Sequence, residues 1–315
     1  VKFNAAGTRQ WATYYGGSNH EDHTTCATDT GLNVYMAGTT ESNNNIFATG
    51  GFQNTFGNLT DAYLVKFNAS GTRQWGTYYG GTNFDEGAQC AVDKQGSVFL
   101  RGTTQSTTNI SGSGFQNTKN SGRDGFLAKF NPNGTRQWGT YYGGPSADFG
   151  NSVCVDTLLN VYLSGFTYST SSIASGGFQN SFGGANDAYL VKFNTNGSRL
   201  WGTYYGGSNG DYGPHCITDK FNNVYLTGYT LSTNAIAFAG IKNVFGGNIE
   251  GFVAKFNPSG TRFWGTYYGG ANDDYLYSSV PDGFGNIYYS GVTLSSALIS
   301  SGGHQNTYGG AEDAF

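Results

Sequence analysis

Two stretches of sequence decide the fold: Asp-Ala-Tyr-Leu-Val-Lys-Phe-Asn at residues 61–68 and Thr-Arg-Gln-Trp-Gly-Thr-Tyr-Tyr-Gly-Gly at residues 72–81. Near copies of both recur at regular intervals along the chain. The tryptophan of the second stretch marks the register, since all 5 tryptophans of the chain occupy this position. The first interval between them is 64 residues and the others are 63, which indicates a fold built from one repeated unit. The tryptophans are Trp11, Trp75, Trp138, Trp201 and Trp264. The repeats are 1–64, 65–127, 128–190, 191–253 and 254–315.

Each repeat contains four predicted strands. The two stretches above are strands joined by an Asn-x-x-Gly connection, which is typical of a β-hairpin. A short strand ending in Asp93 and the segment 97–103 supply the other two, and no segment shows a helical period. The pattern predicts an all-β fold, a β-propeller of five four-stranded blades of about 63 residues each. A β-sandwich needs dissimilar strands, and an open solenoid is the weaker alternative.

The two ends of the chain match halves of one strand. Residues 313–315 match the start of the 61–68 stretch and residues 1–4 match its end, with only the position of Leu64 missing between them. Pairing of the two ends would give hydrogen-bond partners to backbone N–H and C=O groups that otherwise have none. We therefore predict a single domain over 1–315 whose ring is closed by the two termini. A segment cut from a longer array of repeats is the alternative.

Composition excludes several classes of protein. The 315 residues include 16 basic and 20 acidic residues, for a net charge of −4, and 16% are aromatic. Disordered chains are poor in aromatic residues, and nucleic-acid binders need a positive field that this chain lacks. No apolar run approaches the length of a membrane span.

The repeated text resembles the bacterial β-propeller repeat family abbreviated SBBP. The resemblance rests on Asp-x-x-x-Asn-Val-Tyr-x-x-Gly-x-Thr, Gly-Phe-Gln-Asn-Thr-Phe-Gly-Gly, the 61–68 stretch and Tyr-Tyr-Gly-Gly, and it covers the whole chain. It implies a secreted or surface-anchored protein, often beside adhesion-type domains. The family name implies seven blades, which does not carry over to a chain with five repeats. The resemblance names no ligand, because a fold does not fix a function.

Three acidic columns recur in the repeats. Those that contain Asp29 and Asp61 sit at turns and strand starts, where capping or ion pairing is expected. The third follows each Gly-Gly by four residues and leads into the predicted innermost strand. Its carboxylates are our candidates for a ligand-binding ring at one channel mouth, although turn capping is the stronger interpretation. Calcium is the one cofactor candidate, because hard cations take oxygen ligands. The column consists of Glu21, Asp85, Asp148, Asp211 and Asp274.

The cysteines are expected to be free, buried thiols. Cys26, Cys90 and Cys216 share one repeat position, and Cys154 lies one residue outside it, so its side chain is expected on the opposite face of its strand. Equivalent positions on neighbouring blades are expected to exceed the Cα separation that a disulfide tolerates. No Cys-x-x-Cys motif supports a metal site.

The aromatic columns are expected to be core. Each tryptophan supplies the large side chain that blade packing needs, and this outweighs a role as a sugar-stacking platform. In each Tyr-Tyr pair, one ring is expected to be buried and the other exposed at the rim. The loops 41–51, 104–114, 168–177, 231–240 and 294–303 differ from repeat to repeat, which is typical of binding surfaces.

These features predict a non-catalytic, extracellular display or interaction module of adhesion type. We expect a protein or glycan partner at the loops or the channel mouth, neighbouring domains of a longer surface protein, and no nucleic acid. The alternative is a multivalent lectin with up to five equivalent sites. A glycan-active enzyme is a third hypothesis, but it needs a carboxylate pair that the repeats do not single out. No catalytic motif is present, so we expect no catalytic residue and no resident metal.

Overall fold

The computed structural model describes residues 1–120 and 122–315 and confirms the all-β prediction, since these residues form strands and turns and contain no helix. The chain divides into two compact units. The first consists of Val1–Lys119 and Arg123–Tyr142, and the second of Asn120–Gly122 and Gly143–Phe315. No described segment could cross a membrane as an apolar helix.

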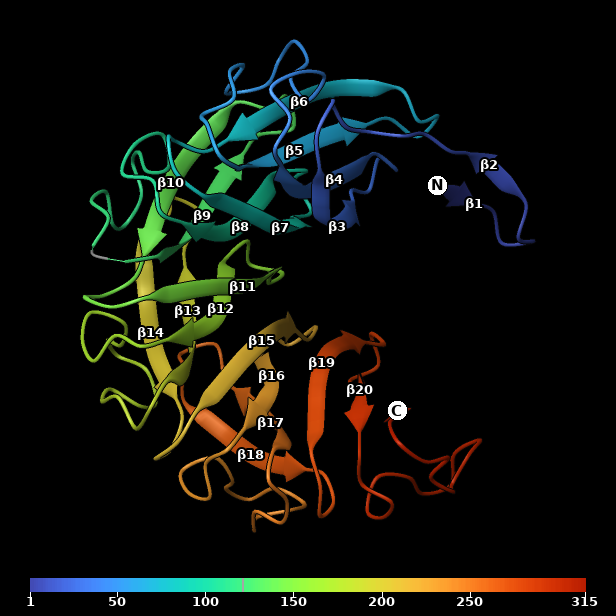
Figure 1. Ribbon diagram of the computed structural model, residues 1–315, viewed down its shortest axis with the longest axis vertical. Helices are drawn as coiled ribbons and strands as arrows, with labels where there is room; N and C mark the ends of the chain where they lie inside the picture. Colours follow the sequence, from blue (N-terminus) through green and yellow to red (C-terminus); the bar gives the residue numbers. More distant parts are fainter. Residues whose placement is uncertain (121) are drawn as a thin grey trace. The chain divides into compact units, whose positions relative to one another are not determined.

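The first unit contains two complete four-stranded antiparallel sheets and one hairpin (Figure 1). One sheet runs in the order β3 (Glu21–Thr28), β4 (Val34–Thr40), β5 (Asp61–Phe67) and β6 (Arg73–Tyr79). The other contains β7 (Asp85–Val92), β8 (Val98–Thr104), β9 (Asp124–Phe130) and β10 (Arg136–Tyr142). The hairpin pairs β1 (Lys2–Phe3) with β2 (Arg9–Trp11).

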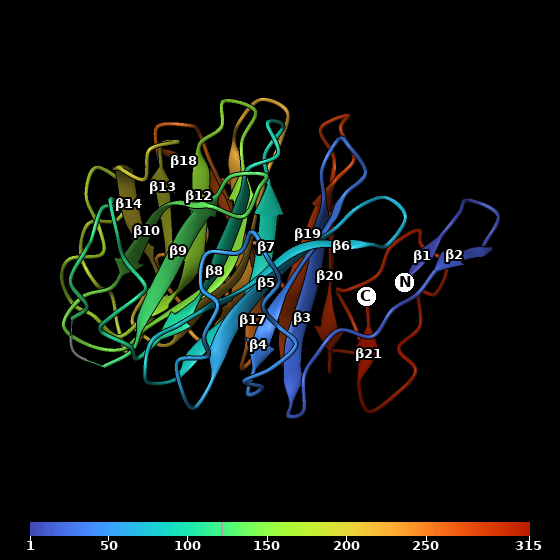
Figure 2. The ribbon, with the colours of Figure 1, turned by 90° about the horizontal axis from the view of Figure 1, so that it is seen from above.

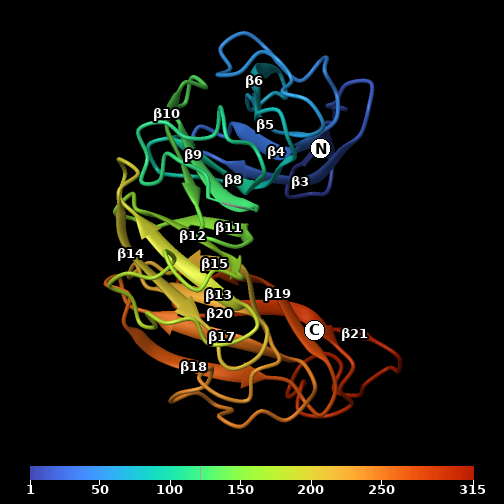
Figure 3. The ribbon, with the colours of Figure 1, turned by 60° about the vertical axis from the view of Figure 1, so that its left-hand side comes forward.

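The second unit repeats this architecture, and Figure 3 shows two of its paired strands, β13 and β14, side by side. Its first sheet contains β11 (Asp148–Val155), β12 (Val161–Thr167), β13 (Asp187–Phe193) and β14 (Arg199–Tyr205). Its second contains β15 (Asp211–Thr218), β16 (Val224–Thr230), β17 (Glu250–Phe256) and β18 (Arg262–Tyr268). Its third has three strands, β19 (Asp274–Pro281), β20 (Ile287–Thr293) and β21 (Asp313–Ala314).

Each complete sheet is a meander of sequential strands, which is the structure of a propeller blade. Tight turns join its first two strands and its last two strands. Between them, a long loop connects the second strand to the third, and Figure 2 shows these long connections at the strand ends. The prediction of four strands per repeat is therefore confirmed in the four complete sheets, and the variable segments lie in the long loops.

Three of the five tryptophans confirm the predicted core, whereas Trp11 and Trp264 are half-buried. Trp75, Trp138 and Trp201 are buried, and the indole N–H of Trp201 donates to the Pro258 carbonyl of the next sheet at 3.1 Å. The Trp75 indole makes the same contact with Pro132 at 3.0 Å. Each of these two rings therefore packs against a neighbouring sheet while its one polar group is satisfied.

One complete sheet is consistent with the prediction for the Tyr-Tyr pairs, since Tyr267 is buried and Tyr268 is half-buried. In the other three complete sheets the prediction is wrong, because both rings are buried. Tyr78 and Tyr79 are an example. The loop before β5 returns along the edge of β6, where Gln53 bridges to Tyr78, and so covers the side expected to be open. On the other side, the Tyr79 hydroxyl donates to the Ile110 carbonyl of the neighbouring sheet. By contrast, Tyr14 is fully exposed.

The ends of the chain take part in separate pairings. β1 pairs with β2 in the first unit, and β21 pairs with β20 in the second. Beside the three-stranded sheet lies an apolar pocket of about 650 Å³, lined in part by Trp264, Leu276, Tyr289 and Phe315. Closure of a five-bladed ring by the two termini stays a prediction.

Candidate functional site

Each acid of the candidate column closes the turn that precedes its own strand. The Asp211 carboxylate accepts hydrogen bonds from the Gly207 N–H (2.8 Å), the Ser232 hydroxyl (2.8 Å) and the Thr230 hydroxyl. The same three contacts, with the equivalent residues of their own sheets, are made by Asp85, Asp148 and Asp274. All four of these aspartates are fully buried.

Glu21 makes a looser version of this arrangement in the first sheet. It accepts from the Gly17 N–H at 3.2 Å and from the Thr40 hydroxyl at 2.8 Å, and it is only half-buried. The observed contacts of the column are those of turn capping within each sheet. Among the residues that the structure describes, no three His, Cys, Asp or Glu side chains form a metal-binding group. A calcium or ligand role for this column stays a prediction.

In two sheets, a second carboxylate converges on the first beside the glycine that follows the Tyr-Tyr pair. The Asp187 Oδ2 atom accepts from the Gly183 N–H (2.8 Å) and the Gln179 amide (3.2 Å), whereas its buried Oδ1 has no hydrogen-bond partner. Asp187 Oδ1 and Asp211 Oδ2 lie 2.6 and 2.7 Å from the place that a Cβ on Gly206 would occupy. Glycine is therefore required between the two acids. The first unit repeats this geometry around Gly80.

Burial of these paired acids raises their pKa values. The pKa of Asp187 rises to about 7 and that of Asp61 to about 8, mainly because burial disfavours the charged form. The neighbouring acid, Asp211 or Asp85, adds to each shift, because two like charges in a low dielectric repel. The pair therefore favours holding a proton near neutral pH.

One repeat replaces this arrangement with an ion pair. Lys242 occupies the position of Gln179, and its ammonium donates to the buried Glu250 carboxylate and, at 2.7 Å, to the Gly269 carbonyl. The ion-pair role considered for this acidic column is thus present at Glu250.

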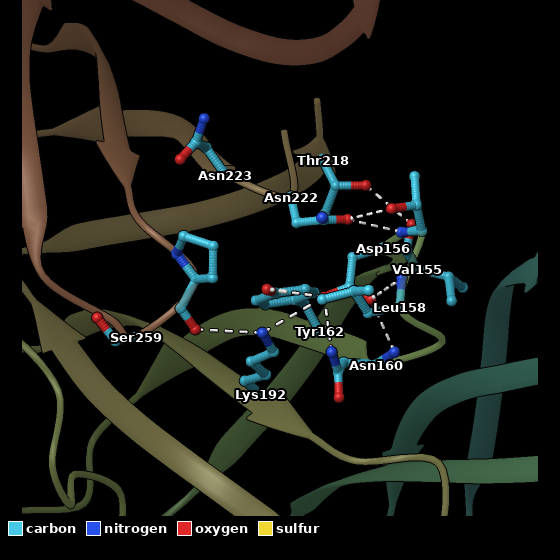
Figure 4. Close-up of polar contacts among 12 residues, drawn as sticks. Val155, Asp156, Leu158, Asn160, Tyr162, Lys192, Thr218, Asn222, Asn223 and Ser259 are labelled. Atoms are coloured by element: carbon cyan, nitrogen blue, oxygen red, sulfur yellow. Dashed lines mark hydrogen bonds and ion pairs between the residues drawn. The ribbon is translucent and has the colours of Figure 1, made fainter. Parts of the chain in front are cut away.

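The remaining acidic column closes the turn between the first two strands of each sheet, and Figure 4 shows one of its members, Asp156. The Asp156 Oδ1 atom accepts from the N–H groups of Leu158 (2.9 Å) and Asn160 (2.8 Å). Its Oδ2 atom pairs with the buried Lys192 ammonium at 3.3 Å, and Lys192 also donates to the Pro258 carbonyl at 3.1 Å. These contacts hold neighbouring sheets together and are structural.

The clearest candidate for a binding surface is an aromatic cluster that the sequence analysis missed. The residue after each acid of the candidate column points to the opposite face of its strand. In the first unit this residue is Asp22 or Glu86, and in the second it is Phe149, Tyr212 or Tyr275. The equivalent position therefore changes from acidic to aromatic between the two units. Figure 1 shows β11, β15 and β19, the first strands of three successive sheets, which carry these aromatic residues.

Ring contacts link these residues into a continuous series. Phe149 and Phe166, paired across β11 and β12, are stacked at 4.5 Å, and Tyr212 and Tyr229, paired across β15 and β16, are stacked at 4.8 Å. Phe166 lies 5.1 Å from Tyr212, and Tyr229 lies 5.1 Å from Tyr275. We call the whole set the aromatic ladder: Phe149, Phe166, Tyr168, Tyr212, Tyr229, Tyr275 and Tyr277.

The aromatic ladder is accessible along much of its length. Tyr168 and Tyr277 expose 42% and 48% of their surface, and the other members are half-buried. Partial burial and neighbouring tyrosines raise the pKa of Tyr229 to about 12, so its hydroxyl keeps its proton and can donate a hydrogen bond. The surface therefore offers apolar ring faces beside neutral hydroxyl groups, as binding sites for organic ligands and proteins commonly do.

The sequence contained a signal for this surface. Among the residues after the five acids of the candidate column, three are aromatic and two are acidic, and the three are consecutive. The near-perfect symmetry of the framework obscured this change. A repeat position whose residue type changes indicates function better than a position that stays the same in every repeat. The framework needs the unchanging positions to form each turn.

All four cysteines are free, as expected, but the expectation of burial holds only for Cys90 and Cys216, since Cys26 is exposed and Cys154 is half-buried. Cys154 and Cys216 lie on β11 and β15, and their Sγ atoms approach to 3.4 Å. Cys90 is buried, and its thiol lies 3.8 Å from the Tyr35 carbonyl, whereas Cys26 is exposed. The offset of Cys154 from the shared repeat position explains the approach, because it turns the side chain toward the next sheet.

The comparisons with known proteins agree with this architecture. The family model described as SBBP, the β-propeller repeat, matches residues 137–171 and 200–234. The chain is also similar to an uncharacterized WD repeat-containing protein of Acanthamoeba polyphaga mimivirus, with 23% identity over 84% of this chain and 23% of that protein. The chain thus spans about a quarter of the length of that relative. The two matched segments are similar to SBBP repeats, and the four-stranded sheets are consistent with a β-propeller, a class of scaffold that fits an interaction role.

Proposed function

We propose that this chain is a non-catalytic, extracellular interaction module that binds its partner through the aromatic ladder. The observation that carries the proposal is the half-exposed, continuous set of stacked rings on three successive sheets. The four fully buried acids of the candidate column argue against a catalytic use of that column, because hydrogen bonds within the chain already occupy them, as at Asp211. The extracellular, adhesion-type setting is the one that the resemblance implies.

The chemistry of the ladder fits a protein partner. Tyrosine is enriched at protein interfaces because it supplies a large apolar face and a hydroxyl at a low cost in conformational entropy. Stacking fixes the rings in place before binding, which reduces the entropy lost on association. The exposed rings of Tyr168 and Tyr277 lie near the two ends of the ladder, so a partner can contact all three sheets.

A glycan partner is the second candidate, and the same rings favour it. Flat aromatic faces with adjacent hydroxyl groups offer apolar contact and hydrogen bonds to a sugar. The ladder belongs to three sheets of the second unit and is absent from the equivalent acidic positions of the first. A glycan partner is therefore expected to occupy one extended site, in place of the five equivalent sites of the lectin alternative.

The experiment is a binding screen with two probes, a glycan array and a phage-displayed peptide library. The test variant combines Tyr168→Ser and Tyr277→Ser, because both rings are exposed and their loss leaves no core cavity. The matched control is Tyr14→Ser, which removes an exposed tyrosine outside the ladder. A calcium chelator is added in a parallel screen to test the acidic column.

We expect saturable binding to one of the probes that weakens at least tenfold in the double variant and is unchanged in the control. Peptides selected by the wild-type chain support a protein partner, and array signal supports a glycan. Binding that is equal in the double variant and the wild type would remove the ladder from the site. Binding lost on chelation would restore the acidic column as the candidate.

A further inference from the structure

Two thiols on neighbouring sheets of the second unit are placed for bond formation. Cys154 lies on β11 and Cys216 on β15, with their Sγ atoms 3.4 Å apart. A disulfide needs about 2.05 Å between the sulfur atoms, so the side chains must close by a little over 1 Å. Small changes of side-chain torsion cover such a movement.

The backbone around the two thiols is already fixed. One residue beyond Cys154, the Val155 carbonyl accepts from the Thr218 hydroxyl at 2.8 Å. A little further on, the Thr157 N–H and hydroxyl both donate to the Asn222 side chain, at 2.8 and 2.7 Å. Figure 4 shows these contacts between the two sheets. They hold β11 and β15 in the register that brings the sulfur atoms together.

The arrangement occurs once among the repeats. At the equivalent place in the first unit, Ala27 occupies the position of Cys154 and packs against the cluster that contains Cys90. One repeat further along, the corresponding residues are Ile217 and Ser279. The framework therefore does not require sulfur at either position.

We propose that Cys154 and Cys216 form a disulfide that links two blades when the chain meets a low-molecular-weight disulfide such as oxidised glutathione. The half-buried Cys154 thiolate attacks one sulfur of the small disulfide, which releases a small thiolate and leaves a mixed disulfide. The Cys216 thiolate then attacks the Cys154 sulfur and expels the second small thiol. Two protein thiols are oxidised, one small disulfide is reduced to two thiols, and the two protons pass to those thiols.

This bond is a modification site that depends on the compartment. Disulfides persist in oxidising surroundings such as the cell exterior and are rare in reducing cytosol. The inference does not rest on the aromatic ladder, so each can fail without the other.

The test uses a chain with Cys26→Ser and Cys90→Ser, which keeps only the two thiols in question. The native protein is incubated with oxidised glutathione at pH 8.5, because burial raises the pKa of the Cys154 thiol and slows its reaction at neutral pH. It is then unfolded, alkylated and digested with trypsin without reduction. Cleavage after Arg136, Lys192, Arg199 and Lys220 places the two cysteines on separate peptides.

We expect the two peptides to be joined, two thiols to be protected from alkylation, and the link to vanish on reduction. Adding Cys154→Ser to this chain is expected to abolish the link, with Cys216 still free for alkylation after unfolding. Full alkylation of both thiols would overturn the proposal, and glutathionylation of the exposed Cys26 in a parallel reaction of the wild-type chain shows that the oxidant is active. A stable glutathione adduct on Cys154 without the cross-link would overturn it as well.

Discussion

Replacing Asp187 with asparagine tests the buried carboxylate pair. In the wild-type chain, the Asp187 Oδ1 atom is buried without a hydrogen-bond partner and faces the same point beside Gly206 as Asp211 Oδ2. An asparagine oxygen can keep the bonds from the Gly183 N–H and the Gln179 amide. Its amide nitrogen then replaces Oδ1 and turns a repulsive contact into a donor next to Asp211.

The sign of the effect follows from the pKa of Asp187, which burial raises from 3.8 to about 7. Between about pH 4 and pH 7 the folded chain keeps a proton that the unfolded chain has released. The stability that this proton contributes is full below about pH 4 and is lost as the pH rises through 7. Three pH units at about 1.4 kcal/mol each limit the loss to about 4 kcal/mol. D187N has no proton to lose here.

Urea unfolding followed by tryptophan fluorescence at pH 4.5, 6 and 8 measures the difference. D187N should match the wild type at pH 4.5 and exceed its unfolding free energy by about 2–4 kcal/mol at pH 8. The control Glu250→Gln should behave in the opposite way and destabilise at pH 8, because it strips the partner from the Lys242 ammonium. A D187N difference that is the same at all three pH values would refute the reasoning.

Three further substitutions test the packing. Gly206→Ala should lower the unfolding free energy by about 1–3 kcal/mol, because the new Cβ meets two carboxylate oxygens. The control Gly303→Ala should leave the unfolding free energy unchanged, because its Cβ meets no other atom, and equal melting temperatures for the two variants would disprove the close approach at Gly206. Trp201→Ala should cost about 3–5 kcal/mol in urea unfolding, and a cost below about 1 kcal/mol would show that the ring is not core. Lys192→Met should cost about 3 kcal/mol by leaving the buried Asp156 without its counter-charge, and a loss that disappears in high salt would instead indicate an exposed pair.

The repeat architecture was predictable because its signals are local. The 63-residue period and the hairpin connections fix strand order without reference to neighbouring sheets. Turn capping by Asp156 and its equivalents was predictable for the same reason, since an aspartate side chain bonds to the backbone N–H groups that follow it. The burial of Trp201 followed from the single large side chain that each repeat contributes.

The features that distinguish this chain depend on packing between sheets, which the repeat pattern does not contain. Tyr79 is buried because its hydroxyl reaches a neighbouring sheet, and Cys154 meets Cys216 because each lies on the facing side of its own strand. The aromatic ladder also crosses from sheet to sheet, as the contact between Tyr229 and Tyr275 shows. A single sequence gives the face on which a side chain lies but not what packs against that face.

Closure of the ring by the two termini is the prediction about the whole chain that goes furthest beyond the individual sheets. The three-stranded sheet ends at β21 beside an open apolar pocket, and the residues missing from its third strand match Leu64 and the first residues of the chain. A circular permutant joins Phe315 to Val1 through one inserted leucine and opens the chain between Gly302 and Gly303, where the structure leaves open space. A second permutant has a flexible 15-residue Gly/Ser linker in place of the leucine.

The decisive measurement is the unfolding free energy of the leucine permutant beside that of the linear chain. The account predicts that this permutant folds and is at least as stable as the linear chain, because the leucine completes one continuous strand. A leucine permutant that fails to fold while the linker permutant folds would contradict the account, since it would show that the two termini do not meet in one strand.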